Sequence, residues 1–556
     1  MQKKYTPRII SIYLVFIALF LIIAARITYL QVFQHRFYKD LATNQYYRLL
    51  PLEGGRGDIF DRRGRILATG MNCYSIFADP KIVKDKDKTA RLIAQELDLS
   101  EEKLLKSLSK KKRFVWVKRK VSWEEKERIR ELDLGGVGFF REEKRFYPQE
   151  KLAASLLGIV GIDNRGLEGL ELNYDDYLSG KDGLVRVLQD SSSKKIMLSQ
   201  HIVAPQKGAD VKLTIDAQIQ YWSEKAIKET VENFRAKQAS VIVMDALNGE
   251  ILALANYPGF NPNKISSLAS QDMRNRAIAD MFEPGSVFKV VTLLASISEN
   301  AFSDSDTVYC ENGKYKIPGS TLHDWKPYGN LTFREVFKKS SNIGVAKLVE
   351  SLGSQAYFKY IKRLEFGKVT GIDLPAESKG SIKPLKRWSR TSQYIIPIGQ
   401  EIAVNLLQLA KTFAAIANDG YLVQPFVVKS VCSRNFCRQL KPKKRKVFDE
   451  KITARAKDIL IEVVSDGTGR RAAVEGIKIG GKTGTAQKYD PKLGRYSPSK
   501  YRATFVGFVA ESNPPLVIGV TVDEPKKSHF GGVVAAPVFK SIARQVVPYI
   551  SSNELN

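Results

Sequence analysis

Ser286 and Lys289 are the residues whose types and spacing point most directly to covalent chemistry. They lie in "EPGSVFKVVTLLASI" (283 to 297), where Pro284 and Gly285 are typical of a helix start. Residues three apart share a helix face, so the lysine amine is expected to reach the serine hydroxyl. Because the stretch is apolar nearly all round, the lysine is expected to be buried. Burial lowers the pKa of a lysine, and the neutral amine is able to take a serine proton.

The Ser-x-x-Lys spacing by itself is weak evidence, because it occurs at six other places in the chain. In those copies the lysine lies in a polar, charged segment and is expected to be solvated. They are Ser100/Lys103, Ser107/Lys110, Ser109/Lys112, Ser191/Lys194, Ser192/Lys195 and Ser497/Lys500. The buried helix is therefore what distinguishes Ser286 as a candidate nucleophile at a helix N-terminus, where free N–H groups favour developing negative charge.

Two further motifs supply hydroxyl, amide and amine groups that could take part in the same reaction as Ser286 and Lys289. In "KKSSNIGVAKL", Ser340 and Asn342 precede an apolar helical run and would present a hydroxyl and an amide from a loop. "GGKTGTAQ" (480 to 487) contains the chain's one Lys-Thr-Gly, with Lys482 as a fixed positive charge and Thr483 and Thr485 as hydroxyls. Its glycines let a substrate backbone approach an edge strand closely.

These three motifs, in this order, resemble the active-site set of penicillin-binding proteins and serine β-lactamases. Further segments resemble class B penicillin-binding proteins in particular, so the resemblance covers nearly the whole chain. They are "RGDIFDRRGRILA", "RFYPQEKLAASLLGIVG", "GLEGLELNYDDYLSG", "GEILALANYPGFNPN", "RNRAIADMFEPGSVFK", "IGQEIAVNLLQLA" and "GGVVAAPVF". Within that class, "GFNPN" and "MFEPGS" are more similar to the division-specific branch than to the elongation branch.

The resemblance implies a mechanism in which Ser286 attacks the D-Ala-D-Ala carbonyl of a donor stem peptide. Lys289 would be the general base, and Ser340 with Lys482 behind it would relay a proton to the leaving amine. The backbone N–H groups of Ser286 and Thr485 would form the oxyanion hole. The acyl-enzyme would then pass to an amine on a neighbouring strand.

The resemblance also implies substrate contacts. Asn342 would hold the substrate amide, Thr483 and Thr485 would hold the terminal carboxylate, and Gly484 would complete this substrate-binding strand. β-Lactams imitate the same terminus and should acylate Ser286. The middle motif has Ser341 where the β-lactamase version has an aspartate, which argues against a class A β-lactamase. The sequence also offers no evident glutamate to activate a deacylating water.

The expected function is thus that of a peptidoglycan D,D-transpeptidase at the division septum. The alternatives are an elongation-type class B transpeptidase, a D,D-carboxypeptidase or β-lactamase, and a non-catalytic division scaffold. The implied partners are peptidoglycan stem peptides, β-lactams, a polytopic membrane glycan polymerase and other division proteins. No glycosyltransferase region is recognisable in the sequence.

Residues 9 to 30 are expected to form a transmembrane signal anchor. Residues 9 to 25, "IISIYLVFIALFLIIAA", carry no charge and approach the length that spans a bilayer. Lys3, Lys4 and Arg8 precede them without an acidic residue, so residues 1 to 8 are expected in the cytoplasm and the catalytic part outside it. A cleaved signal peptide is the alternative, against which the long apolar run and the missing A-x-A site argue.

Composition limits the other function classes. The 556 residues carry a net charge of +29, but the basic residues are spread along the chain and no nucleic-acid motif accompanies them. Four histidines are scattered without ligand spacing, so we expect no metal and no cofactor. Four cysteines are too few for a disulfide scaffold, and Cys432 with Cys437 could equally be a disulfide or a free pair.

The expected fold class is α+β. After the anchor we expect an elongated pedestal of the penicillin-binding protein dimerisation type at 50–205, with helix N-caps at Ser100 and Ser122. A transpeptidase domain is expected at 210–550. Its amphipathic helix (216 to 234), its hairpin across Asn248-Gly249, three strand-like runs near the C-terminus and a helix from about 536 to 549 predict an antiparallel sheet with helices on both faces.

Overall fold

The protein was analysed as a computed structural model, which describes residues 6–189, 195–265, 269–491 and 494–553. By its contacts the chain forms two compact units: unit 1 is 1–55 with 180–207, and unit 2 is 56–179 with 208–556. Residues 56–179 of the expected pedestal (50–205) therefore share one compact unit with the catalytic residues, whereas its two ends belong to unit 1. The domain boundaries drawn from the sequence stay a prediction.

Unit 1 consists of helices followed by a small antiparallel sheet. Within the described part of the unit, three strands pair in the order β1-β6-β7. The elements are α1 (Thr6–Thr28), η1 (Tyr29–Phe33), α2 (His35–Tyr46), β1 (Tyr47–Leu52), β6 (Gly183–Gln189) and β7 (Lys195–Val203). The helical segment Pro7–Phe33 has a mean hydropathy of 2.6 and is the one helix among the described residues long and apolar enough to cross a membrane. It fits the anchor predicted at 9–30.

The N-terminal part of unit 2 is built on a long, curved sheet with three helices packed against one end. Its elements are β2 (Ile59–Phe60), β3 (Ile66–Ala78), α3 (Lys86–Leu97), α4 (Glu101–Leu108), β4 (Val115–Val121), α5 (Trp123–Glu131), β5 (Val137–Phe146), α6 (Ala154–Leu157), α7 (Gly169–Asn173), α8 (Asp175–Leu178) and β8 (Asp210–Leu213). The predicted caps are confirmed: Ser100 caps α4, and Ser122 forms a capping box with Glu125 at α5.

The sheet of this part continues into strands from the C-terminal half of the chain. Over the described residues, seven strands follow the order β19-β18-β8-β2-β3-β4, with β5 paired to β3. β18 (Val428–Cys432) lies antiparallel to β8 and β19 (Cys437–Gln439) lies at the edge. The sequence did not predict this shared sheet, which ties the pedestal strands to the catalytic part through backbone hydrogen bonds.

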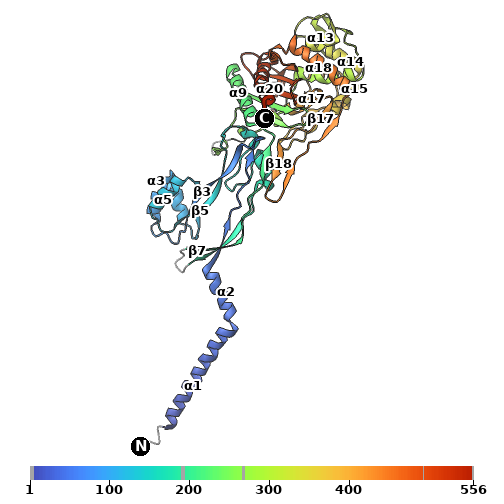
Figure 1. Ribbon diagram of the computed structural model, residues 1–556. Helices are drawn as coiled ribbons and strands as arrows, with labels where there is room; N and C mark the ends of the chain where they lie inside the picture. The colour runs from blue at the N-terminus through green and yellow to red at the C-terminus, as the bar shows by residue number, and fades with distance from the viewer. Residues whose placement is uncertain (1–5, 190–194, 266–268, 492–493, 554–556) are drawn as a thin grey trace. The chain divides into compact units, whose positions relative to one another are not determined.

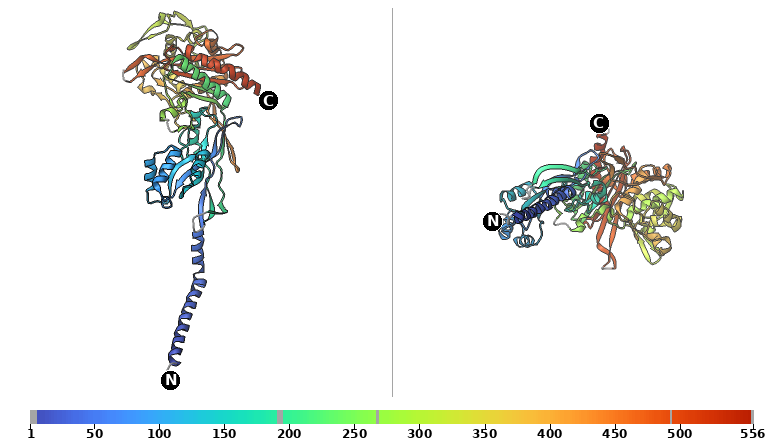
Figure 2. Two further views of the ribbon diagram at one scale, coloured as in Figure 1. Left: turned by 90° about the vertical axis from the view of Figure 1, so that its left-hand side faces the viewer. Right: turned by 90° about the horizontal axis from the view of Figure 1, so that it is seen from below.

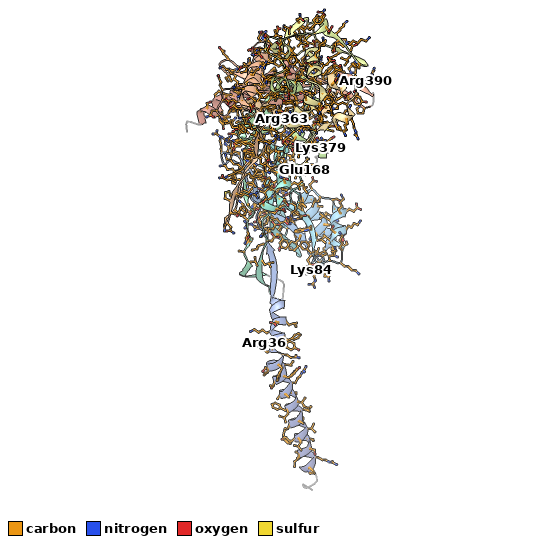
Figure 3. All side chains as sticks on the ribbon, turned by 90° about the vertical axis from the view of Figure 1, so that its right-hand side faces the viewer. Arg36, Lys84, Glu168, Arg363, Lys379 and Arg390 are labelled. Atoms are coloured by element: carbon orange, nitrogen blue, oxygen red, sulfur yellow. A yellow bond between two sulfur atoms is a disulfide. The ribbon has the colours of Figure 1, made fainter. Side chains whose placement is uncertain are left out.

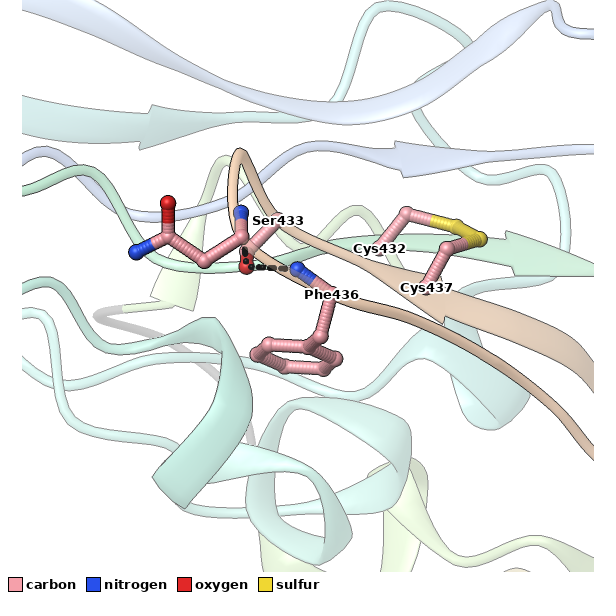
Figure 4. Close-up of a disulfide and its surroundings, with 5 residues drawn as sticks. Cys432, Ser433, Phe436 and Cys437 are labelled. Atoms are coloured by element: carbon pink, nitrogen blue, oxygen red, sulfur yellow. Dashed lines mark hydrogen bonds between the residues drawn. A yellow bond between two sulfur atoms is a disulfide. The ribbon is translucent and has the colours of Figure 1, made fainter.

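Figure 4 shows the disulfide that closes the β18–β19 hairpin. Cys432 is bonded to Cys437, so the alternative left open by the sequence is settled in favour of a disulfide. Between them, the Ser433 hydroxyl accepts a hydrogen bond from the Phe436 N–H at 3.3 Å. Cys73 and Cys310 are free and buried.

The catalytic part of unit 2 is an antiparallel sheet between two layers of helices (Figure 1). In the described residues five strands follow the order β10-β9-β23-β22-β21. They are β9 (Gln238–Asp245), β10 (Ile251–Tyr257), β21 (Ile479–Asp490), β22 (Arg495–Val509) and β23 (Leu516–Asp523). This is the predicted α+β fold, and the predicted hairpin turns at Gly249 with a φ of +86°, which favours glycine.

Alternate residues of β9 point into two different cores. Val241 and Val243 pack with α9 (Ala217–Phe234) and α20 (Ala536–Asn553), which lie side by side in Figure 1 and Figure 2 although they are far apart in the sequence. Ile242 and Met244 face the opposite core. That core contains α11 (Arg276–Ala279), α12 (Lys289–Ser298), α14 (Asn342–Leu352), α15 (Ser354–Arg363), α17 (Leu406–Ala417) and α18 (Glu450–Ser465). The expected helices on both faces are confirmed.

The remaining elements of this part are short. They are α10 (Ser270–Met273), η3 (Gly285–Phe288), β11 (Thr307–Tyr309), η4 (Glu311–Gly313), β12 (Lys314–Ile317), β13 (Ser320–His323), β14 (Asn330–Thr332), α13 (Phe333–Lys338), β15 (Ser381–Ile382), η5 (Leu385–Arg387), α16 (Ser392–Ile395), β16 (Ile402–Ala403), β17 (Tyr421–Val423), β20 (Lys444–Lys446), η6 (Arg470–Ala472) and α19 (Gly531–Val534).

Basic side chains are distributed over unit 2 rather than gathered at the motifs. In Figure 3 the labelled Lys84, Lys379 and Arg390 point outward from separate segments, and all three are exposed. This distribution agrees with the sequence analysis, in which the basic residues are spread along the chain.

A buried charge network holds the start of unit 2. The Glu171 carboxylate has no exposed surface and accepts hydrogen bonds from Arg56 Nε at 2.7 Å and from Arg145 Nε at 2.6 Å. Arg56 also pairs with Asp175 at 2.6 Å. The ions are buried but mutually compensated, so removal of one member leaves an uncompensated charge.

We predict that Glu171→Gln lowers the free energy of unfolding by about 3 to 5 kcal/mol, because two buried guanidinium groups lose their shared carboxylate. Asp163→Asn is the control: Asp163 pairs with Arg119 but its side chain is 71% exposed. Its loss should cost less than about 1 kcal/mol. Denaturant unfolding of the detergent-solubilised protein measures both, and equal costs would contradict the structural importance of the network.

Candidate active site

Ser286 lies in the tight turn η3, directly before α12. The sequence predicted an α-helix from this point, but the first turn is a 3₁₀ turn and the α-helix begins at Lys289. Gly285 has a φ of +55°, which permits the sharp entry into the turn. Ser286 is half-buried, while Val287 and Phe288 anchor the turn in the core.

The turn packs directly against the Lys-Thr-Gly strand β21. A Cβ atom on Gly484 would lie 2.7 Å from the Pro284 carbonyl oxygen and 2.8 Å from Val287 Cγ2. Glycine at 484 is therefore required for this close approach. It brings the backbone of Thr485 next to the turn that carries Ser286, because a Cβ on Gly285 would lie 3.1 Å from the Thr485 carbonyl oxygen.

Lys289 is fully buried, as predicted. Its amine donates to the Ser340 carbonyl oxygen and to Asn342 Oδ1, both at 2.7 Å, and lies 3.3 Å from Ser340 Oγ. Burial lowers the pKa of Lys289 to about 7. The expected hydrogen bond between Lys289 and Ser286 is not among the contacts of the described residues; the amine is directed toward the Ser340 turn instead.

Lys482 contacts the same serine. Its amine donates to Ser340 Oγ at 2.8 Å and to the Thr483 carbonyl oxygen at 3.4 Å. Burial and the charge of neighbouring Lys289 hold the pKa of Lys482 well below its usual value. The Ser340 hydroxyl thus lies between two amines, and its own proton is free to be donated to a third group.

Ser340 is held in an unusual backbone conformation at the end of α13. Its φ is +58°, in the left-handed region that non-glycine residues rarely adopt. Such a residue persists only where its surroundings hold it. The carbonyl oxygen of Ser340 accepts the hydrogen bond from Lys289, which is one of the restraints.

The Asn342 amide is bonded at both ends within the protein. Its oxygen accepts from Lys289, and its Nδ2 donates to the His323 carbonyl oxygen at 2.9 Å. A primary amide has two N–H donors, so one remains for a ligand. The predicted contact of Asn342 with a substrate amide stays a prediction.

The two threonines of β21 form hydrogen bonds with different parts of the protein. Thr483 Oγ1 donates to Thr468 Oγ1 at 3.1 Å, and Thr485 Oγ1 accepts from the Gly531 N–H at 3.0 Å. Gly531 begins α19, in the "GGVVAAPVF" segment, and a Cβ there would lie 2.3 Å from the Gly484 carbonyl oxygen. This packing fixes the strand while each threonine keeps hydrogen-bonding capacity for an anionic group.

Sequence reasoning assigned no role to three residues that contact or adjoin the motifs. Thr468 supports Thr483, Asp324 binds the N-terminus of α14, and Glu283 precedes the Ser286 turn. Glu283 accepts hydrogen bonds from the Glu401 N–H and the Tyr496 hydroxyl, both at 2.9 Å, and burial raises its pKa. None of the three belongs to a spacing pattern, so only the fold identifies them.

No group of three or more His, Cys, Asp or Glu side chains among the described residues has the arrangement of a metal site. The four residues predicted to carry the reaction, Ser286, Lys289, Ser340 and Lys482, come from three separate segments that meet here. The arrangement suits acyl transfer: a hydroxyl on a tight turn, a nearby amine of low pKa, and a second hydroxyl between two amines.

We predict that Gly484→Ala reduces acylation by a β-lactam about 100-fold, because the new methyl group must displace β21 from the Ser286 turn. Gly135→Ala is the matched control, since a Cβ at Gly135 meets nothing within 4 Å. Rates of labelled-penicillin incorporation measure the effect. Unchanged incorporation in Gly484→Ala would show that the close approach is unnecessary.

Comparisons with known proteins show the family of the chain. Residues 51–213 match the penicillin-binding protein dimerisation domain, and residues 239–544 match the penicillin-binding protein transpeptidase domain. Stage V sporulation protein D of Bacillus subtilis is 36% identical over 553 residues, which cover 97% of this chain and 85% of that protein. The peptidoglycan D,D-transpeptidase FtsI of Escherichia coli K12 is 30% identical over 526 residues, covering 93% and 87%.

A solved structure indicates the same family. The crystal structure of penicillin-binding protein 3 from Mycobacterium tuberculosis in complex with aztreonam has a TM-score of 0.70 and 27% sequence identity, covering 91% of this chain and 97% of that one. The family domains, the relatives and the fold all indicate the same family. The chain therefore belongs to the class B penicillin-binding proteins.

Proposed function

We propose that this protein cross-links peptidoglycan stem peptides through an acyl-enzyme on Ser286. The observation that carries the proposal is the Ser340 hydroxyl, which lies between the amines of Lys289 and Lys482 beside the Ser286 turn. Relatives named as peptidoglycan D,D-transpeptidases, FtsI and the probable PenA of Neisseria gonorrhoeae, support the substrate class.

In the acylation step the Ser286 oxygen forms a bond to the carbonyl carbon of the penultimate D-Ala. Neutral Lys289 takes the hydroxyl proton as this bond forms. Lys289 is not hydrogen-bonded to Ser286 in the structure, so the amine must turn toward the hydroxyl when substrate arrives; apo geometry alone does not exclude a base. The backbone N–H groups of Ser286 and Thr485 stabilise the oxyanion.

Collapse of the tetrahedral intermediate breaks the C–N bond to the terminal D-Ala. The leaving nitrogen takes the Ser340 proton, and protonated Lys289, whose amine lies 3.3 Å from Ser340 Oγ, replaces it with the proton taken from Ser286. Lys482 holds Ser340 Oγ in place for this relay through its hydrogen bond at 2.8 Å. An amine of a second stem peptide then attacks the ester. The proton of this amine leaves through the same groups, and Ser286 regains its hydroxyl as the cross-link forms.

Substrate binding is assigned to the strand and the turn beside the nucleophile. Thr483 and Thr485 hold the terminal carboxylate, with Gly484 allowing the peptide to approach β21 as an added strand. Asn342 donates its remaining N–H to the substrate amide. β-Lactams enter by imitating the D-Ala-D-Ala end, and their acyl-enzyme persists.

We place the catalytic part on the outer side of the cytoplasmic membrane, with the N-terminus inside. Lys3, Lys4 and Arg8 before the apolar helix support this orientation. The Cys432–Cys437 disulfide supports an oxidising compartment. A septal role rests on the likeness of "GFNPN" and "MFEPGS" to the division-specific branch, and a membrane glycan polymerase with other division proteins would then be the partners.

The alternatives differ in what happens to the acyl group or to the cell. A D,D-carboxypeptidase releases D-Ala without cross-linking, and a β-lactamase rapidly releases penicilloate. Asp324 and Glu283, the two carboxylates noted beside the motifs, already accept hydrogen bonds from protein groups, which does not favour a water-activating role. Depletion should cause filamentation for a septal role and rounding for an elongation role; a scaffold would not bind penicillin covalently.

We predict that labelled penicillin modifies the wild-type protein on the peptide that contains Ser286, and that Ser286→Ala traps no label. The control is Ser109→Ala, which removes a serine of another Ser-x-x-Lys copy and should keep full labelling. Peptide mass spectrometry locates the adduct. Label retained by Ser286→Ala, or never acquired by the wild type, would refute the proposed nucleophile.

We predict that the second-order rate of acylation rises with pH through about 7, where the pKa of Lys289 lies. Below this pH the amine is protonated and unable to act as a base; above it the neutral amine predominates. Stopped-flow acylation from pH 5.5 to 9 measures the profile. A midpoint near the usual lysine pKa, or no pH dependence, would exclude Lys289 as the general base.

A further inference from the structure

Asp324 binds the N-terminus of the helix that follows the Ser340 turn. Its Oδ1 accepts from the backbone N–H groups of Asn342 and Ile343, the second at 3.2 Å, and its Oδ2 accepts from the Ser341 hydroxyl at 2.7 Å. A carboxylate at this position also interacts favourably with the positive end of the dipole of α14. Asp324 lies in the loop after β13, outside all three motifs.

The loop around Asp324 is fastened to the turn on both sides. The His323 carbonyl oxygen accepts from Asn342 Nδ2 at 2.9 Å, and Trp325 Nε1 donates to the Lys339 carbonyl oxygen at 3.0 Å. Residues 323–325 therefore bind residues on each side of Ser340. This is the restraint that a serine with a φ of +58° requires.

Ser341 connects the loop to the motif. Its side chain is buried, caps α14 by accepting from the Gly344 N–H at 2.8 Å, and donates to Asp324. In the Ser-Asp-Asn version of the motif an aspartate stands at this position. In this chain the motif itself carries no carboxylate, and one is supplied from a separate segment.

Asp324 is also the carboxylate whose charge acts on Lys289. The titratable groups that face Lys289 are Lys482 from β21, Asp324 from the loop and the Cys310 thiol. Those that face Asp324 are Lys289, Cys310 and Tyr328. Two buried amines repel each other when both are charged, and Asp324 offsets part of this repulsion by favouring the protonated form of Lys289.

We propose that Asp324 is a positioning residue for the reaction: it holds the turn that carries Ser340 and Asn342, and its charge acts on the proton held by Lys289. The inference rests on the proposed function, in which Lys289 is the base. It adds a residue outside the motifs whose removal should alter both the rate and the pH profile of acylation.

The test compares acylation profiles of the full-length wild type and Asp324→Asn. The variant keeps the shape of the side chain but lacks the charge, so the protonated form of Lys289 loses support. The acidic limb of the profile is the low-pH range in which the acylation rate rises as Lys289 loses its proton. This limb should therefore move to lower pH by about 0.5 to 1 unit. The plateau rate should fall at least about 10-fold, because the Ser340 turn loses its firm attachment.

Two further variants separate charge from mere helix capping. Thr332→Ala removes the capping side chain of the preceding helix α13 without changing any charge, so the melting temperature should fall while the acidic limb stays in place. The double variant Asp324→Asn with Ser341→Asp returns a carboxylate to the N-terminus of α14 and should return the limb toward the wild-type position. If Asp324→Asn alone does not fold, the acylation profile of the double variant is compared with that of the wild type instead.

The outcomes distinguish the two proposals. A wild type that is not acylated, or whose profile has no acidic limb near pH 7, contradicts the proposed function. A normal wild-type profile with the same limb in Asp324→Asn means that Asp324 only caps a helix, and this inference is then wrong. If only the double variant folds, an acidic limb that lies half a pH unit or more from the wild-type position contradicts the inference.

Discussion

The shared contact of two buried lysines with the Ser340 hydroxyl is the interaction on which the rest of the catalytic part depends. An ammonium group loses its hydration on burial, and a second one nearby adds repulsion. Lys289 and Lys482 are both fully buried, so both are driven toward the neutral form. Burial therefore gives Lys289 an amine with a pKa of about 7, next to a hydroxyl that contacts both lysines.

The surrounding architecture exists to bring these groups together and to exclude water. α12 is buried from Lys289 to Ile297 and carries Lys289, while β21 lies at the edge of the sheet and carries Lys482. Gly484 lets β21 approach the turn η3, which carries Ser286 directly before α12. The Ser340 turn completes the site from a third direction, and its strained backbone is held by the loop that contains Asp324.

Much of this was predictable from the sequence, for identifiable reasons. Ser286 and Lys289 stood out because an apolar helix surrounds them, and the Asn248-Gly249 turn and the caps at Ser100 and Ser122 are determined locally. Asp324 was not predictable, since a single aspartate in a loop has no periodicity and acts only through the fold. The 3₁₀ turn at Ser286 and the orientation of the Lys289 amine depend on packing against β21 and the Ser340 turn, and the sheet shared by β18 and β8 depends on long-range pairing.

The central claim is that Lys289 is a neutral amine at physiological pH, and its titration is measured most directly by NMR. In protein labelled with ¹³C at lysine Cε, solvated lysines titrate near their usual pKa of about 10.4. The account predicts a lysine signal that titrates near pH 7 and disappears in Lys289→Met. If every lysine signal titrates above pH 9 and Lys289→Met removes only one of those, Lys289 is charged at neutral pH and the account is wrong.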